Sequence, residues 1–164
     1  MTDQPTVAGK ANGQDTASQT STQPIQVHVQ YVKDLSFENP AAPQSLLAGQ
    51  PAPRIEIGVN VQGGPIAEGV YEVVLQLRVE AKVEQTTVFL AEVAYCGVFS
   101  LPGIPPEHHR PVLMIEAPRL LFPFARAIVA DVTRDGGYPP LLLTPIDFAE
   151  LYRHQMAEAT PAQA

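Results

Sequence analysis

Apolar and polar residues alternate along four segments in the first part of the chain. Such a repeat of two residues predicts β-strands that bury one face. The apolar positions of these segments are Ile25, Val27, Val29 and Tyr31; Ile55, Ile57, Val59 and Val61; Tyr71, Val73, Leu75, Leu77, Val79 and Ala81; and Phe89, Ala91, Val93 and Tyr95. Only residues 83–85 separate the last two segments, which predicts a hairpin between them.

A proline-rich stretch, residues 34–53, separates the first two alternating segments. Its prolines are Pro40, Pro43, Pro51 and Pro53. Because proline cannot donate a hydrogen bond to a sheet, we expect a long crossover loop that begins at Asp34. Gly63-Gly64-Pro65 is expected to end the second strand.

Apolar residues recur every three or four positions after Pro102-Gly103, which predicts helices over residues 105–117 and 118–135. Pro118 suits the first turn of the second helix, Pro123 predicts a kink or boundary, and Gly136-Gly137 predicts the end. The side chains expected to form the buried side of this helix are Leu121, Phe124, Ile128 and Val132.

A last helix is expected to open at Thr144 as its N-cap, with Pro145 in the first turn. Its apolar stripe consists of Phe148, Leu151 and Tyr152. The predicted fold class is therefore α+β, with a four-stranded antiparallel sheet, a long crossover loop after the first strand, and a following helical layer.

One domain is expected over residues 25–156. Residues 1–24 and 157–164 are polar and carry no periodic apolar pattern, so both are predicted to be disordered tails.

Composition narrows the classes of partner. Of the 164 residues, 45% are apolar and 16% are charged, and the formal net charge is −7. Negative charge disfavours nucleic acid, which needs clustered lysine and arginine, and it disfavours an anionic membrane surface. A large apolar fraction with few charges predicts apolar surface that other subunits or ligands cover.

The chain also carries signs of a cytoplasmic location. Residues 1–23 lack the apolar centre of a signal peptide, and no stretch of about 18 apolar residues predicts membrane insertion. Cys96 is the one cysteine, which excludes an intrachain disulfide and fits a reducing compartment.

Signals for catalysis are weak. Glu107-His108-His109 is the one cluster of metal-ligand type, but adjacent histidines on a helix point apart, so a solvated helix start is expected. Neither Gly63-Gly64 nor Gly136-Gly137 has the lysine of a phosphate-binding loop. Cys96 lies in an apolar strand and is expected to be buried and unreactive. We therefore expect no enzyme activity, no metal and no cofactor.

Carboxylates gather on the polar sides of the predicted strands. Glu56, Glu72 and Glu92 lie on these polar sides, Asp34 and Glu38 flank the end of the first strand, and Val74, Val88 and Leu90 stand among them if the strands align. Such an acidic face suits a basic partner. Alternatively, the charges merely solvate an open sheet face, and both interpretations stay open on the sequence alone.

Large apolar residues also stand next to irregular backbone. They are Phe37, Leu46 and Leu47 in the crossover, and Leu141, Leu142, Leu143 and Phe148 near the end. These side chains could frame a groove for an extended peptide, or they could simply pack the loop.

Five stretches of the chain resemble the SecB family of export chaperones. They are residues 31–43 (YVKDLSFENPAAP), 71–75 (YEVVL), 97–100 (GVFS), 121–126 (LFPFAR) and 140–148 (PLLLTPIDF). The stretches occur in order and at fitting spacing over nearly all of the predicted domain.

The resemblance implies an ATP-independent holdase of the cytoplasm, assembled as a homotetramer with the helix after Pro105 in the interface. Family members bind unfolded precursor proteins and deliver them to SecA, a translocation ATPase with a basic C-terminal tail. The positions that match the SecA contacts are Asp34, Glu38, Leu90 and Glu92. The positions implied for the client groove are Phe37, Leu46, Leu47, Phe99, Leu142, Leu143 and Phe148.

Three rival interpretations remain at this point. A SecB-like chaperone dedicated to a single client, such as an antitoxin, would share the fold without needing SecA. A small enzyme would use His108 or His109, and a purely structural scaffold would ignore unfolded chains.

Overall fold

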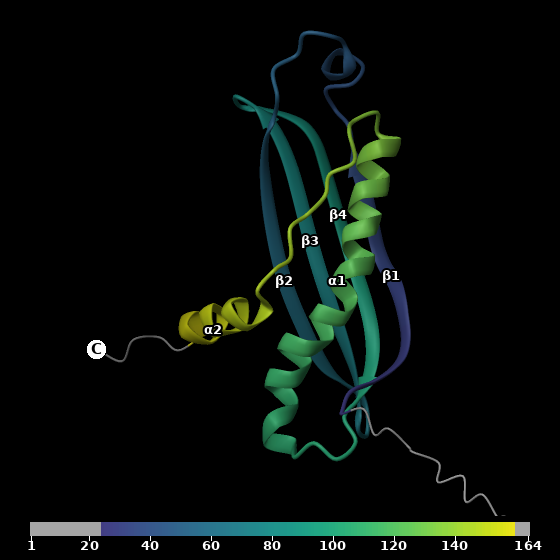
Figure 1. Cartoon of the computed structure of the whole chain (residues 1–164), viewed down its shortest axis with the longest axis vertical. Helices are drawn as coiled ribbons and strands as arrows, with labels where there is room; N and C mark the ends of the chain where they lie inside the picture. The colour runs from purple at the N-terminus through teal and green to yellow at the C-terminus, as the bar shows by residue number, and fades with distance from the viewer. Residues whose placement is uncertain (1–23, 160–164) are drawn as a thin grey trace, which may run out of the picture.

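The computed structural model of the chain describes residues 24–159. The tail predicted for the first residues lies outside this range, apart from Pro24, and so do residues 160–164. The predicted α+β class is confirmed, because a four-stranded antiparallel sheet precedes the helices (Figure 1). The elements are β1 (Gln26–Glu38), the short 3-10 helix η1 (Gln44–Leu46), β2 (Arg54–Ala67), β3 (Val70–Val83), β4 (Thr86–Ser100), the short 3-10 helix η2 (Pro106–His108), α1 (His109–Asp135) and α2 (Phe148–Ala159).

The strands lie in the order β1-β4-β3-β2, so β1 and β2 form opposite edges of the sheet. Residues 39–53 therefore cross from one edge to the other at one end of the sheet, as the proline-rich stretch predicted (Figure 1). The predicted start of this loop at Asp34 is wrong, because Asp34 pairs with Ala94 and the strand continues to Glu38. The first proline of the stretch comes only at Pro40, so nothing before it interrupts the ladder.

The prediction that Gly63-Gly64-Pro65 ends the second strand is also wrong. β2 continues through these residues, with Gly63 opposite Val73 and Pro65 opposite Tyr71. Because β2 is an edge strand, the missing N–H of Pro65 can be tolerated.

Irregular pairing in two strands changes which side chains share a face. The register of β1 shifts between Val27 and Val29, so Val29 and Tyr31 do not lie on the face of Val27, contrary to the simple alternation. In β4 the pairing partners skip Val88, which is buried rather than part of the acidic face. Such bulges add one residue to one strand and cannot be read from a period of two.

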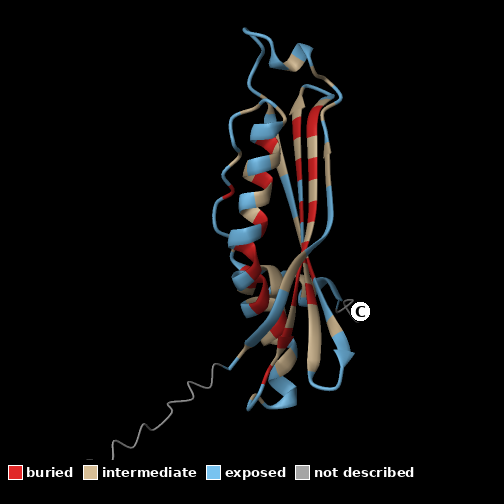
Figure 2. Cartoon of the chain, turned by 90° about the vertical axis from the view of Figure 1, so that its right-hand side faces the viewer, coloured by how far each residue is buried: buried red, intermediate tan, exposed pale blue. Residues whose placement is uncertain are grey.

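The hydrophobic core lies between α1 and the inner face of the sheet, where Figure 2 shows the buried positions. The helix packs tightly on β4 at Gly97, where a Cβ atom would stand 2.7 Å from the Phe99 ring and 2.9 Å from Leu121 Cδ2. Glycine at this position therefore lets α1 lie directly on the strand. The opposite side of the sheet, here called the outer face, is not covered by α1 (Figure 2).

Helix α1 is one continuous helix with Pro118 and Pro123 inside it, so the two predicted helices are a single element. Pro118 does not start a helix, and no boundary occurs at Pro123. Most buried positions recur every four residues, at Leu113, Ala117, Leu121, Ala125, Val129 and Thr133, and Pro118 and Phe122 are buried beside them. The predicted stripe is therefore wrong at Phe124, whose side chain is exposed. Most buried positions follow a spacing of four residues, and the step of three from Leu121 to Phe124 leaves this line on the helix surface, which explains the error.

The end of α1 was predicted correctly. Gly137 adopts φ +95°, and its N–H donates to Arg134 O while the Tyr138 N–H donates to Thr133 O. This pair of bonds is the Schellman motif, which requires a residue in the left-handed region and favours glycine there.

After the helix the chain runs extended beside α1 back along the sheet, from Tyr138 to Asp147 (Figure 1). The predicted helix start at Thr144 is wrong, because α2 begins at Phe148. Asp147 acts as the cap, since its Oδ1 accepts the Glu150 N–H at 3.0 Å. Helix α2 continues to Ala159, beyond the boundary expected at Met156.

The histidine pair also differs from expectation at one position. His108 is exposed, but His109 is half-buried at the start of α1. Its Nδ1 lies 2.8 Å from the Tyr71 hydroxyl and its Nε2 lies 2.7 Å from Ile104 O. His109 therefore joins the helix start to β3 and to the preceding loop, which a sequence pattern does not reveal.

Candidate functional site

Strand pairing brings the four predicted docking residues together on the outer face. Glu38 of β1 lies opposite Leu90 of β4, and two positions further along Ser36 lies opposite Glu92. Asp34 follows opposite Ala94. Asp34 and Glu38 are exposed, while Leu90 and Glu92 are half-buried. The four side chains thus occupy alternate positions on two neighbouring strands.

Strand β3 adds two charges that the sequence analysis left out of this set. Glu80 lies opposite Leu90, and Arg78 lies opposite Glu92. Arg78 Nε donates to Glu92 Oε1 at 3.0 Å, and Arg78 Nη1 donates to Glu80 Oε2 at 2.8 Å. Alternation along residues 71–82 already placed Arg78 and Glu80 on the polar side, but their neighbours depend on the register with β4.

The carboxylates of the outer face differ in how far they are neutralised. The Arg78 guanidinium, with a hydrogen bond from the Thr87 hydroxyl, holds the pKa of Glu80 below its usual range. Lys82 Nζ also lies 3.5 Å from Glu80 Oε2. By contrast, Asp34 and Glu38 have no ion-pair partner within residues 24–159. The negative potential of the face is therefore strongest along the β1 side.

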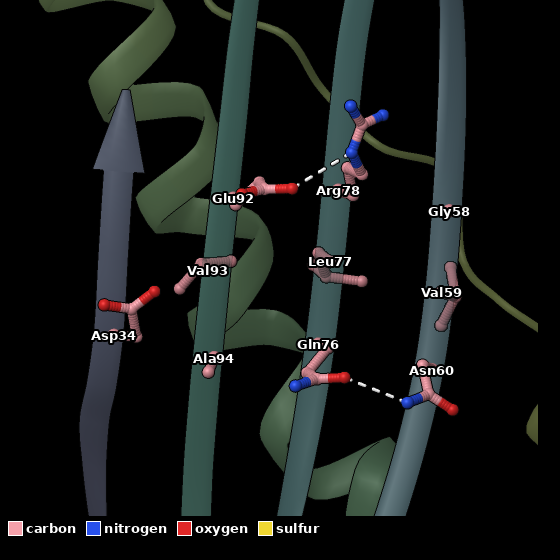
Figure 3. A pocket seen from close by; sticks show the side chains of 10 residues that line it. All are labelled: Asp34, Gly58, Val59, Asn60, Gln76, Leu77, Arg78, Glu92, Val93 and Ala94. Carbon is pink, nitrogen blue, oxygen red and sulfur yellow. Dashed lines mark hydrogen bonds and ion pairs between the residues drawn. The ribbon is translucent and has the colours of Figure 1, made fainter. Parts of the chain in front are cut away.

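A hollow of about 420 Å³ opens on the outer face beside Arg78, where Gly58 and Ala94 contribute almost no side chain (Figure 3). Arg78 and Glu92 stand at one end of it, and Gln76 and Asn60 stand at the other end, joined by a hydrogen bond of 2.9 Å. Asp34 extends beside Ala94 on β1 (Figure 3). The hollow has the size and the charge to accept a long cationic side chain.

The seven residues implied for the client groove separate into two sets. Three lie inside the core, with exposed fractions of 0% for Phe99, 4% for Leu143 and 1% for Phe148. A client cannot touch these three side chains without rearrangement of the core. The other four lie near the crossover, with Phe37 half-buried and Leu46, Leu47 and Leu142 exposed.

Hydrogen bonds hold the start of the crossover against the end of α1. Asn39 Nδ2 donates to Gly136 O at 2.9 Å, and the Tyr138 hydroxyl donates to Asn39 Oδ1 at 2.6 Å. Ser45 Oγ lies 2.7 Å from the same tyrosine hydroxyl. These contacts give the loop that carries Leu46 and Leu47 a fixed base.

A cavity of about 470 Å³ lies under the crossover loop. Leu47, Val83, Val88 and Tyr138 contribute to its lining, together with loop residues 49–53. The Tyr138 ring also packs on Phe89 with ring centroids 4.8 Å apart. The sequence analysis missed Tyr138 and Val88, because their positions beside the loop depend on the packing of distant segments. The cavity can bury an apolar side chain of another polypeptide.

A further apolar strip runs along the inner face at the β1 edge. Val32 and Leu35 of β1 are exposed opposite Tyr95 and Val93. The Tyr95 ring stacks on Phe124 of α1 at a centroid distance of 6.0 Å, and half of Phe124 remains exposed. This strip consists of Val32, Leu35, Leu120 and Phe124, each at least 40% exposed.

No arrangement of side chains suited to catalysis is found in the part of the chain that the structure describes. Across residues 24–159, no group of three His, Cys, Asp or Glu side chains is arranged to hold a metal ion. Cys96 is fully buried, as predicted, and burial raises the pKa of its thiol. No helix within the same residues is long and apolar enough to cross a membrane.

Comparison with known proteins gives consistent relatives. The family described as preprotein translocase subunit SecB matches residues 18–159. The Protein-export protein SecB of Rhodospirillum centenum is 54% identical over 157 residues, covering 95% of this chain and 93% of the relative. The protein of the same name from Paramagnetospirillum magneticum is 55% identical over 140 residues, covering 85% and 90%.

Among solved structures, a SecB-like chaperone of Mycobacterium tuberculosis, in complex with a peptide of the HigA1 antitoxin, has a similar fold. The TM-score is 0.62 at 15% sequence identity, over 75% of this chain and 91% of that chain. At this identity the likeness concerns the fold alone.

Proposed function

The chain belongs to the SecB family and is a chaperone of protein export, and on that premise we propose that it holds unfolded precursor proteins and delivers them to SecA. The single observation that carries the client part of this proposal is the apolar surface around the crossover. Leu46, Leu47 and Leu142 are exposed there beside the cavity that Leu47 helps to line. A soluble protein gains nothing from such exposure unless the side chains meet a partner.

The client-binding surface is restricted to the residues that a client can reach. We propose Leu46, Leu47 and Leu142 as direct contacts, with Phe37 at their base. Phe99, Leu143 and Phe148 support this surface from the core. Each apolar client side chain that is buried contributes about 1–3 kcal/mol, without any demand for a particular sequence. Several such sites act together on one long chain through their high effective concentration.

The outer face is the proposed docking surface for SecA. Asp34, Glu38 and Glu92 offer carboxylates to a basic segment, and Leu90 offers an apolar contact between them. Their alternate positions on β1 and β4 suit a partner that lies flat across the strands. Because this face is opposite the core, docking and client holding involve different surfaces.

We also propose that the chain assembles as a homotetramer, a dimer of dimers, in the cytoplasm. The strip of Val32, Leu35, Leu120 and Phe124 supports this proposal, since a second copy would cover it. The unpaired edge of β1 lies beside the same strip and leaves backbone groups available to a partner. The assembly has no catalytic activity in this proposal, and holding requires no nucleotide.

The rival of a chaperone dedicated to one antitoxin is not favoured. The relatives named for protein export share about half of their residues with this chain over most of its length. The antitoxin-bound chaperone shares 15%.

The refolding of a slow-folding exported precursor tests the proposed function. The precursor is diluted from denaturant with and without a stoichiometric amount of the assembled protein, in the absence of nucleotide. We expect refolding to stop, while folded precursor added separately stays unbound, because the protein binds only the unfolded state. Unchanged refolding would contradict the holdase and favour a scaffold or a single-client chaperone.

A further inference from the structure

We propose that Arg78, through its ion pair with Glu92, competes with basic partners for this carboxylate. Arg78 thereby limits the affinity of the docking surface for such partners. This inference rests on the proposed docking of a basic segment on the outer face. It adds a residue from β3 that sets the strength and the salt dependence of docking. A basic partner has to replace the Arg78 guanidinium at Glu92 or share the carboxylate with it.

The geometry around Arg78 fits a competitor rather than a structural support. Its guanidinium reaches in two directions, to Glu92 on β4 and to Glu80 on its own strand. The Arg78 and Glu92 side chains are 50% and 46% exposed, so an incoming cation can reach the carboxylate from solvent. Ion pairs this exposed contribute little to stability, so the guanidinium can be displaced at small cost.

The hollow beside Arg78 provides a place for the incoming side chain. Figure 3 shows Arg78 and Glu92 at one end of this hollow and Ala94 towards the other end, and neither Gly58 nor Ala94 carries a side chain long enough to fill it. A lysine or arginine that enters along Ala94 meets the Glu92 carboxylate on one side and Asp34 on the other. Arg78 and this side chain would then compete for the same Glu92 oxygens.

The role of Arg78 implies that a partner needs several positive charges to bind this surface well. At Glu92 itself a single cation gains little, because it replaces an existing charge pair with an equivalent one, so its gain comes from the contact with Asp34 alone. A segment with several cations reaches both Asp34 and Glu38, which have no ion-pair partner within the described residues. Arg78 therefore favours multiply charged basic segments over isolated lysines.

The test compares the parent with Arg78→Gln, using two probes, hexalysine and SecA, by titration calorimetry at low and at high salt. We expect both probes to bind Arg78→Gln more tightly, by about threefold to tenfold at low salt, with the gain lost at high salt. The matched control is Arg54→Gln, which removes the same charge from the same face. Arg54 lies four residues along β2 from Gly58 and pairs with Glu56, about 13 Å from the hollow along the strand.

Glu92→Gln in both backgrounds separates competition at Glu92 from a general change of charge. We expect this substitution to weaken hexalysine binding more in the Arg78→Gln background than in the parent. Equal affinities of Arg78→Gln and Arg54→Gln for hexalysine, or an equal effect of Glu92→Gln in both backgrounds, would overturn the role of Arg78. SecA that fails to bind the parent contradicts the proposed docking instead, while the hexalysine measurements still decide the role of Arg78.

Discussion

The Phe37 ring lies directly over Gly136, the residue that caps the C-terminal end of α1. A Cβ atom added at Gly136 would overlap Phe37 Cζ and would stand 2.5 Å from Phe37 Cε1. The backbone of Gly136 has φ −73°, which any residue can adopt. Glycine is needed here for space rather than for conformation, and it allows the end of β1 to pack against the end of the helix.

Gly136→Ala is therefore expected to destabilise the protein by about 1–3 kcal/mol, because the Phe37 ring has to leave its position beside Phe89. Urea unfolding measures this cost. In a Phe37→Ala background the same change should cost nothing or should stabilise slightly, since the clash is gone and alanine lowers the entropy of the unfolded chain. An equal cost in both backgrounds would show that the two residues do not interact.

Thr133 joins the extended segment after α1 to the helix. Its hydroxyl donates to Val129 O at 2.9 Å and accepts the Leu141 N–H at 3.0 Å, in a fully buried position. Thr133→Val keeps the shape but leaves the Leu141 N–H without a partner, so we expect a loss of about 1–3 kcal/mol in urea unfolding. Thr133→Ser retains the hydroxyl and should lose clearly less. Similar losses for the two variants would assign the effect to packing.

Tyr31 and Glu72 form a pH-sensitive contact on the outer face. The hydrogen bond from Tyr31, with a second from Lys33, lowers the pKa of Glu72 from its ordinary 4.5. The same bond raises the pKa of Tyr31 from 10.0 to about 12. The Glu72 contribution to stability is present above pH 4.5 and is lost as the pH falls further. The Tyr31 contribution is present below pH 10.0 and is lost as the pH rises towards 12.

Tyr31→Phe removes the Tyr31 contribution and the part of the Glu72 contribution that Lys33 does not supply, so its loss of stability should be largest between these limits and should shrink on either side. In the parent, ultraviolet absorbance of the phenolate should show a titration step near pH 12, which Tyr31→Phe lacks. Tyr152→Phe serves as the matched control and should keep the step. A step that survives in Tyr31→Phe would rule out this hydrogen bond.

Leu142 and Leu143 are neighbours with opposite expected roles, since 75% of Leu142 is exposed and 4% of Leu143 is exposed. We expect Leu142→Ser to change the free energy of unfolding by less than about 0.5 kcal/mol and to weaken client holding in the refolding assay. Leu143→Ala should cost about 2–4 kcal/mol of stability through the cavity it leaves. Normal client holding by Leu142→Ser would remove Leu142 from the proposed surface.

Glu92→Lys reverses a charge at the centre of the proposed docking surface and places it beside Arg78. We expect SecA binding to weaken by more than about tenfold, with client holding unchanged. Calorimetry with SecA and the refolding assay measure the two properties. Glu68→Lys, at the turn between β2 and β3, makes the same charge change away from the docking surface and should bind SecA normally. Equal SecA affinities of Glu92→Lys and the parent would exclude Glu92 as a contact.

Regular periodicity in the sequence was sufficient to predict the elements in which the pattern is unbroken. The alternation in β3 and in β4 from Phe89 onward, the short link within residues 83–85 and the helix end at Gly136-Gly137 are local features, and each was predicted from the sequence. These local features depend on residues that are close together in the sequence, so the sequence alone is enough to predict them. The resemblance named Asp34, Glu38, Leu90 and Glu92 as docking residues, and strand pairing brings them to one face, while their role in docking stays a prediction.

Tertiary structure alone decided the points that depend on contacts between distant segments. The bulge after Val27 turns Tyr31 towards Glu72, and the burial of Phe99 and Phe148 removes them from any direct client contact. Arg78 shows the same limit, since its partners on the docking surface follow from the register between β3 and β4. The sequence determined which residues face the same way wherever a strand is free of bulges. Only the fold determined which of them meet, because register, bulges and packing are set by the energy of the whole assembled core.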